Sequence, residues 1–276
     1  MTSSLRTLSP HRHLPVGSAD VLPSMAAAAW PHRAALRTGT GTVTFAELDH
    51  RISRLAFGLR QRIGGDGLTV AVSSVLGMDF PAAFYAVVRS GNVAAPVNPR
   101  MPAEAFAKLL ADTDARAVVL SRWMYERVRS VLDTRLELVL LLDAPADPGV
   151  LTCAELATGG ALLVEPRDRD ENEPAAIVLG AGRAGHVRTA GVTHHELKAQ
   201  AVRAAGRLSE GDVVLNTLSA FSPAHLGAGL HAGATQVLMG NLDPAAAARE
   251  ALRHGASHLL TGDGEVQLER RLLAAS

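Results

Sequence analysis

The chain has 276 residues and no formal net charge, because 27 lysines and arginines balance 27 aspartates and glutamates. Hydrophobic residues make up 47% and charged residues 20%, a composition that supports a packed core and argues against wholesale disorder. A sequence pI near 7.2 lacks the basic excess of duplex-binding proteins, so no nucleic-acid partner is expected. Only Lys108 and Lys198 are lysines, so chemistry that needs a lysine has two candidates.

Residues 1–23 contain serine, proline, arginine and histidine but no continuous apolar segment, so they do not resemble a secretory signal. We expect residues 1–24 to form a flexible tail. No apolar run is long enough to span a bilayer. Cys153 is the only cysteine, which excludes an internal disulfide and fits a reducing compartment. The protein is therefore expected to be cytoplasmic, with no membrane partner.

Helix-like and strand-like segments alternate from about residue 25. Thr44 and Glu47 form a capping box, in which a hydroxyl and a carboxylate satisfy free amides at the start of a helix. That helix places one apolar face along Leu48, Ile52, Leu55, Ala56, Leu59 and Ile63. The pattern then predicts strands at 69–75, 93–97, 117–120 and 136–142, separated by helices at 79–91, 102–111 and 123–132.

The second half continues the alternation after a weaker stretch at 144–170. The charge run at 167–171 is interpreted as a solvated connection. Strands are predicted at 175–179, 213–216, 235–239 and 257–261, and helices at 193–208, 244–254 and 265–275, the first opened by a second capping box at Thr193 and Glu196. Continuous apolar strands between helices are typical of parallel sheets covered on both faces, so the predicted fold class is α/β, with parallel sheets flanked by helices.

Residues 180–185 form a glycine-rich loop, Gly-Ala-Gly-Arg-Ala-Gly, between a strand and a helix. Backbone amides and a helix N-terminus in this arrangement attract phosphate, and the loop formally matches the dinucleotide fingerprint. However, that fingerprint opens its helix within the motif, whereas here the capping box delays the helix to Thr193, and no acidic residue follows at the expected distance. A turn without a ligand is the other interpretation from the residues alone.

Residues 42–48, Thr-Val-Thr-Phe-Ala-Glu-Leu, are similar to the helix start T-Y-x-E-L. Residues 91–99, Gly-Asn-Val-Ala-Ala-Pro-Val-Asn-Pro, are similar to G-A-V-x-V-P-L-N-P. With 103–120, which matches the segment that follows, they resemble the N-terminal part of the adenylate-forming, AMP-binding ligases, the superfamily of acyl-CoA synthetases and adenylation domains. The resemblance covers about residues 33–263. It implies two interleaved lobes, one at about 68–205 and the other joining about 25–63 to 210–276.

The resemblance places the family's phosphate loop, Y-T-S-G-T-T-G-x-P-K-G-V, on residues 179–190, and its T-H pair on Thr193 and His194. Only the glycines remain, as Gly182 and Gly185. The serine position is Ala181, two threonine positions are Arg183 and Ala184, and the lysine position is Arg188. Arginine is a planar fork and does not replace a compact ammonium at a tight site, although it binds phosphate bidentately. The resemblance therefore implies a remnant anion site at Gly182, Arg183, Gly185, Arg188, Thr193 and His194, with Thr193 also serving as a helix cap.

Other family segments also depart from the pattern. The acyl-pocket segment P-L-x-H-x-x-G corresponds to residues 219–225, with Ser222 in the histidine position. Residues 261–263, Thr-Gly-Asp, spell the family's ribose-binding motif but come too early, and are interpreted as a strand end and turn. The family's adenine-binding segment and its C-terminal domain would follow the last residue of this sequence. We therefore expect a truncated ligase-like protein.

The expected function is that of a truncated acyl-CoA-synthetase-like protein, inactive in adenylation and acting as a binding or accessory partner. Such a protein could bind an acyl or nucleotide ligand, including ATP or AMP, and the sequence assigns no cofactor to it. The alternatives are one chain of a split acid–thiol ligase and, less favoured, a dinucleotide-binding oxidoreductase. A truncated lobe would expose apolar surface, which predicts a homodimer or a protein partner. The 11 histidines show no convergent zinc-ligand spacing, and no G-x-S-x-G elbow is present, so neither a metal site nor a serine hydrolase is expected.

Overall fold

The structure is a computed structural model of the whole chain. It describes residues 14–39, 41–63, 67–132, 134–143, 149–158, 169–181, 187–217, 222–240, 244–261 and 264–267.

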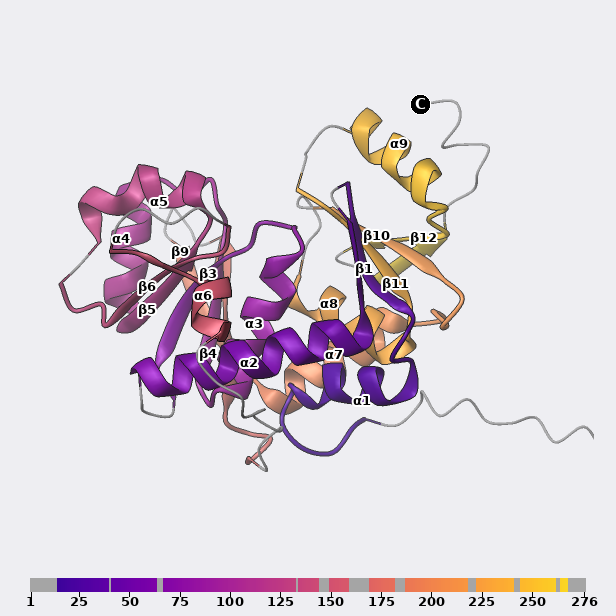
Figure 1. Cartoon of the computed structure of the whole chain (residues 1–276), viewed down its shortest axis with the longest axis horizontal. Coiled ribbons are helices and arrows are strands. Elements are labelled where there is room, and N and C mark those ends of the chain that lie inside the picture. Colours follow the sequence, from indigo (N-terminus) through magenta and orange to yellow (C-terminus); the bar gives the residue numbers. More distant parts are fainter. Residues whose placement is uncertain are drawn as a thin grey trace, which may run out of the picture.

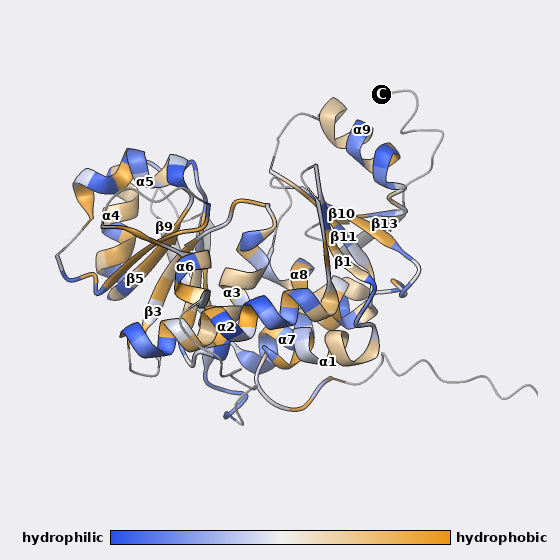
Figure 2. Ribbon diagram, in the orientation of Figure 1, coloured by the Kyte–Doolittle hydropathy of each residue, from blue (hydrophilic) through white to orange (hydrophobic). Residues whose placement is uncertain are grey.

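The strands among these described residues form two sheets, and the first has seven strands in the order β7-β6-β5-β3-β4-β8-β9. All neighbouring pairs are parallel except β8 and β9, which are antiparallel. Successive residues of its central strands β3 and β5 are buried and largely apolar, and both strands are mostly orange in Figure 2. The strands are β3 (Thr69–Ser73), β4 (Val93–Val97), β5 (Ala115–Leu120), β6 (Leu138–Leu141), β7 (Leu151–Thr152), β8 (Pro174–Ala181) and β9 (Val187–Thr193).

The second sheet has six strands in the order β13-β12-β10-β11-β1-β2. Its inner pairs are parallel, and an antiparallel strand closes each edge. This sheet joins strands from the two ends of the chain, because β1 pairs with β11 about 200 positions later. The strands are β1 (Ala34–Thr38), β2 (Gly41–Thr44), β10 (Val213–Thr217), β11 (Thr235–Met239), β12 (His258–Thr261) and β13 (Gly264–Gln267).

The two sheets lie at opposite ends of the molecule, with α1, α2, α3, α7 and α8 packed together between them (Figure 1). One core cluster includes Leu36 of β1, Val70 of β3, Phe84 of α3 and Leu230 of α8, so the two sheets share a core. A second cluster packs α4 and α5 against the outer face of the seven-stranded sheet. The helices are α1 (Val21–Ala29), α2 (Phe45–Ile63), α3 (Asp79–Arg89), α4 (Ala103–Asp112), α5 (Arg122–Val128), α6 (Cys153–Thr158), α7 (His194–Ala205), α8 (Pro223–Ala232) and α9 (Pro244–His254), with a 3-10 turn at Arg129–Val131.

The capping box predicted at the start of α2 is confirmed. Glu47 N–H donates to Thr44 Oγ1 at 3.2 Å, and Thr44 N–H donates to Glu47 Oε2 at 2.8 Å. All six residues predicted for the apolar face of this helix are buried. The 3.6-residue spacing of apolar side chains therefore identified both the helix and the side that faces the core.

The structure corrects several expected elements. Residues 14–24, expected to belong to a flexible tail, include the start of α1 and the buried residues Ser18, Ala19 and Asp20. Strand β9 lies where no element was predicted, and Gly264–Gln267 forms strand β13 where the expected helix 265–275 begins. Residues 268–275 of that helix lie outside the described residues.

A buried arginine ties the central helices together. Arg89, at the end of α3, is 1% exposed. Its Nε donates to Asp20 Oδ2 at 3.3 Å, and its two terminal nitrogens donate to Asp49 Oδ1 at 2.7 Å and Ser53 Oγ at 2.6 Å. The guanidinium therefore joins the segment before α1 and helix α2 to α3. A buried charge of this kind is tolerated only when it is fully paired.

The surface of the described part of the chain has few exposed large hydrophobic side chains. Val16, Met25, Trp123 and Leu252 are the exposed ones, and they lie on the N-terminal segment, α1, α5 and α9 respectively. Helices α5 and α9 are at opposite ends of the molecule (Figure 1). Within the same described residues, no helix is both long and apolar enough to cross a bilayer.

Candidate functional site

The glycine-rich loop joins β8 to β9 as the turn of an antiparallel hairpin. Gly180 pairs with Arg188, and Ala181 pairs with Val187 next to the turn. Strand β9 then runs seven residues before α7 begins at His194. The predicted delay of the helix to Thr193 is therefore confirmed, and the loop lacks the helix N-terminus that a dinucleotide fold directs at the pyrophosphate.

Three of the six predicted site residues, Arg188, Thr193 and His194, fall among the residues that the structure describes. Gly182, Arg183 and Gly185 lie outside the described residues. Arg188 is placed by its backbone in β9, opposite Gly180, while its side chain lies outside the description. Thr193 and His194 are fully described, at the far end of β9 and the start of α7.

Thr193 is the N-cap of α7. Its Oγ1 accepts a hydrogen bond from Glu196 N–H at 3.1 Å, and Glu196 Oε2 accepts one from Thr193 N–H at 2.9 Å. This reciprocal pair satisfies two of the free amides at the helix start. The predicted capping role is confirmed, and the hydroxyl is engaged within its own helix.

His194 is completely buried beneath the N-terminal segment. Its Nδ1 accepts a hydrogen bond from Ala19 N–H at 3.1 Å, which places the proton of the neutral ring on Nε2. Within the described part of the chain, Nε2 has no hydrogen-bond partner. Burial lowers the pKa of His194 below its ordinary value, although the nearby Asp20 carboxylate opposes that shift. His194 therefore holds the N-terminal segment as a neutral acceptor and does not offer a positive charge to an anion.

Lys198 forms a buried anchor one turn further along α7. Its side chain is 0% exposed, and Nζ donates to Glu171 Oε1 at 2.8 Å, to Pro15 O at 2.6 Å and to Gly17 O. All three donor positions of the ammonium are thus used. No local pattern predicts this anchor, because residues 15 and 17 lie more than 180 positions from Lys198.

Glu171 completes the anchor from the segment before β8. Besides Lys198, it accepts a hydrogen bond from Gly17 N–H at 2.8 Å. The bond from Lys198 lowers the pKa of Glu171 to about 2, and the Gly17 bond adds to the shift. In the same segment, Arg169 pairs with Glu173 and donates to Gly91 O at 2.6 Å. The charge run at 167–171, interpreted as a solvated connection, therefore supplies at least two structural contacts.

Two other groups of polar side chains have structural contacts rather than a catalytic arrangement. Ser257 Oγ and Asp212 Oδ1 both approach Nδ1 of His258, at 2.9 and 3.6 Å, so the ring cannot relay a proton between them as a catalytic triad requires. Ser222, in the position of the family's histidine, caps α8 by accepting from Ala224 N–H at 3.3 Å. In the described ranges, no three His, Cys, Asp or Glu side chains converge in a way that could hold a metal ion.

Comparison with known proteins gives a consistent match. The family model "AMP-binding enzyme" matches residues 24–261. A salicyl-AMP ligase / salicyl-S-ArCP synthetase of Mycobacterium tuberculosis is 30% identical over 263 residues, covering 86% of this chain and 45% of that protein. A benzoate–CoA ligase of Thauera aromatica is 28% identical over 224 residues, covering 77% of this chain and 42% of its own length. The chain thus spans less than half the length of these relatives.

The fold is also similar to solved structures. A long-chain-fatty-acid-CoA ligase from Archaeoglobus fulgidus superposes with a TM-score of 0.80 at 20% identity, covering 90% of this chain and 52% of that one. A putative long-chain-fatty-acid CoA ligase from Rhodopseudomonas palustris gives 0.76 at 24% identity, covering 88% and 62%. At these identities the likeness shows the fold: the N-terminal domain of adenylate-forming ligases.

Proposed function

Because the chain belongs to the family of AMP-binding enzymes, we propose that it is an acyl- or aryl-CoA-ligase-like domain that binds an acid or nucleotide without catalysing adenylation. It would then act as a binding or accessory partner. The proposal rests on the chemistry of the β8–β9 loop rather than on the fold, since a fold alone does not determine an activity.

The observation that carries the proposal is the position of the two lysines. The family's loop lysine is replaced by Arg188. Lys198 is buried and fully paired with Glu171 and two backbone carbonyls, so it cannot move to the loop without leaving these acceptors empty. Lys108 is on α4, where it pairs with Asp112 at 2.8 Å. Neither lysine can supply the compact charge that the loop lacks.

The loss of hydroxyl groups supports the same conclusion. The serine and threonine positions of the loop are Ala181, Arg183 and Ala184, so the donors expected to hold the β- and γ-phosphates are absent from the sequence. Preorganised donors of this kind commonly contribute a factor of about 10² to 10³ to a rate. Arg183 and Arg188 retain positive charge, which can attract an anion. Their planar guanidinium groups do not replace the compact charge that positions the phosphates of ATP for adenylation.

Pyrophosphate exchange and calorimetry test the proposal together. With ATP, Mg²⁺ and a panel containing salicylate, benzoate and a long-chain fatty acid, we expect no exchange above buffer, while AMP or ATP binds measurably. The variant R183A/R188A should lose that binding, and Arg203→Ala on α7 is the matched control. Robust exchange would refute the inactivity, and absence of any nucleotide or acid binding would refute the binding role.

The accessory role further implies a complex with a second copy or another protein. Light scattering of the purified chain, alone and with a bound nucleotide, measures self-association directly. A monodisperse monomer under both conditions would contradict a homodimer.

A further inference from the structure

A pocket of about 370 Å³ lies between the C-terminal half of α2 and the short helix α6. Its volume is within the range of small-molecule sites. It is distinct from the β8–β9 loop, because Leu151 in its wall belongs to β7, and β7 and β9 are the opposite edges of the seven-stranded sheet. Six strand spacings separate those edges, or roughly 29 Å.

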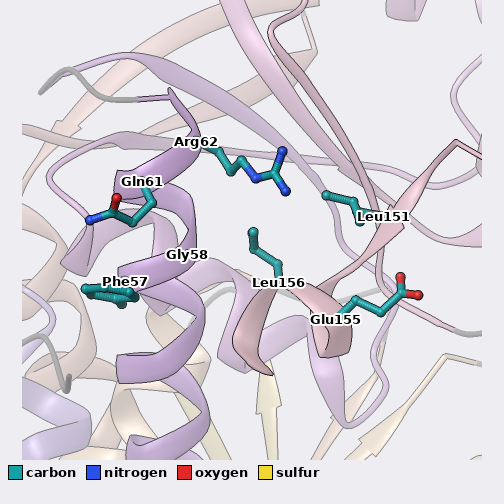
Figure 3. Close-up of a pocket in the computed structure, with 7 residues that line it drawn as sticks. All are labelled: Phe57, Gly58, Gln61, Arg62, Leu151, Glu155 and Leu156. Carbon is teal, nitrogen blue, oxygen red and sulfur yellow. The ribbon is translucent and has the colours of Figure 1, made fainter. Parts of the chain in front are cut away.

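One side of the pocket is apolar, formed by Phe57, Leu151 and Leu156, whereas Gln61, Arg62 and Glu155 supply its polar lining. On the apolar side, α6 lies directly on the backbone of α2. A Cβ atom on Gly58 would be only 2.6 Å from Leu156 Cγ and 2.7 Å from Leu156 O, so this close approach requires glycine. Leu156 and Leu151 then face the space beside it (Figure 3). An apolar group of a ligand would be removed from water against these side chains.

One cation extends over this apolar wall. The guanidinium of Arg62 reaches across the pocket toward Leu151 (Figure 3). Arg62 has no ion pair or hydrogen bond with a residue that the structure describes. Glu155, the pocket's carboxylate, points away from it (Figure 3) and accepts hydrogen bonds from Thr152 N–H and Oγ1, both at 2.8 Å. Among the residues that the structure describes, no anion therefore compensates the positive charge of Arg62.

We propose that this pocket binds a small monocarboxylate with an apolar body, supplied as a free small molecule. The planar guanidinium matches a carboxylate bidentately, while Leu151 and Leu156 contact the body. A dianion such as phosphate is disfavoured, because Arg62 is the one cation among the lining residues and the Glu155 carboxylate lies at the edge of the pocket. Phosphate also has no apolar part that could contact Leu151 and Leu156. The proposal does not depend on the function proposed above.

Titration of the ¹⁵N-labelled full chain with hexanoate tests this site. We expect saturable shifts of the Gly58 and Leu156 amide resonances, because both residues line the pocket. Arg62→Gln should weaken the apparent affinity for hexanoate at least tenfold. Arg54→Gln, an exposed arginine on the same helix outside the pocket, is the matched control and should leave the titration unchanged.

Two further probes separate charge from apolar contact. Hexylamine has a similar chain with the opposite charge, and inorganic phosphate has charge without an apolar body, so neither should give saturable shifts at these amides. The proposal is overturned if hexanoate gives no saturable shift, if Arg62→Gln binds as well as the wild type, or if hexylamine or phosphate shifts the two amides equally. Spectra of the variants without ligand establish that they are folded.

Discussion

Replacing Glu171 by glutamine removes one negative charge from the anchor that holds the N-terminal segment, while keeping an oxygen that accepts from Lys198 and Gly17. The pKa of Glu171 falls from 4.5 to about 2 on folding. A shift of this size in a fully buried group corresponds to about 3 kcal/mol. Solvent reaches 29% of the Glu171 side chain, and screening reduces the expected loss to about 1–2 kcal/mol at pH 7.

The sign of the pH dependence follows from the direction of the shift. A carboxyl group with a lowered pKa in the folded protein stabilises it above the unfolded pKa of 4.5, and this contribution disappears as the pH falls through about 2. The difference in unfolding free energy between wild type and Glu171→Gln should therefore be constant above about pH 5.5. At pH 3 this difference should be less than half of its value at pH 7.

Urea unfolding followed by circular dichroism at pH 7, 5, 4 and 3 measures that difference. Glu137→Gln is a suitable control, because Glu137 is paired with Arg116 on the surface and is 39% exposed, so it should cost less than about 1 kcal/mol. A variant as stable as the wild type at pH 7, or a difference that does not change down to pH 3, would refute the reasoning.

Three other substitutions have defined costs, each measurable as a change in the free energy of urea unfolding. Arg89→Leu leaves the buried carboxylate of Asp20 unpaired and should cost about 3–5 kcal/mol. Gly58→Ala forces a methyl group against Leu156 and should cost about 1–3 kcal/mol, through displacement of α6. Thr193→Ala removes the cap of α7 and should cost about 0.5–2 kcal/mol.

Matched controls accompany these three variants. Arg116→Leu removes an exposed ion pair and should change stability by less than about 1 kcal/mol. Gly77→Ala places a methyl group where no atom lies within 4 Å, so no steric cost is expected. Thr193→Ser retains the capping hydroxyl and should restore most of the loss. If a variant lowers the free energy of unfolding no more than its control does, the contact assigned to that residue is not stabilising.

Local signals predicted much of the fold. Strands 93–97 and 235–239 match β4 and β11 residue for residue, because the first is a continuous apolar run and the second ends in the apolar run 237–239. The capping boxes at Thr44 and Thr193 located two helix starts to the residue. A third box, Thr152 with Glu155, was present in the sequence and would have identified α6 within the stretch described as weak.

Elements stabilised by distant partners were missed. Strand β9 has no continuous apolar run, and its conformation depends on pairing with β8. Helix α8 contains Gly227 and Gly229, which have poor helix propensity. A Cβ on Gly227 would lie 2.5 Å from Ala201 Cβ, so the residue that weakens the helix locally is the one that permits its contact with α7.

The site was predicted only in outline. The loop's departures from the family's motif are readable in the sequence, and so is the cap at Thr193. The roles of His194 and Lys198 were not, because both depend on backbone groups of residues 15–19 that approach only in the folded chain. Glu171 was likewise taken for a solvated charge because a carboxylate's partner cannot be read from a local charge run.

Residues 15–19 can be anchored only after α7 has been synthesised, so this part of the fold forms late during translation. Lys198 is synthesised 183 residues after Pro15, an interval of roughly 9 to 37 seconds at 5–20 residues per second. The interval between the synthesis of β1 and that of β11, its parallel partner, is longer still. During this interval the N-terminal segment and one edge of the β1–β2 hairpin have no native partner. Their unpaired backbone N–H and C=O groups are then exposed, and a chaperone or a second nascent chain can bind them before the native partners are made.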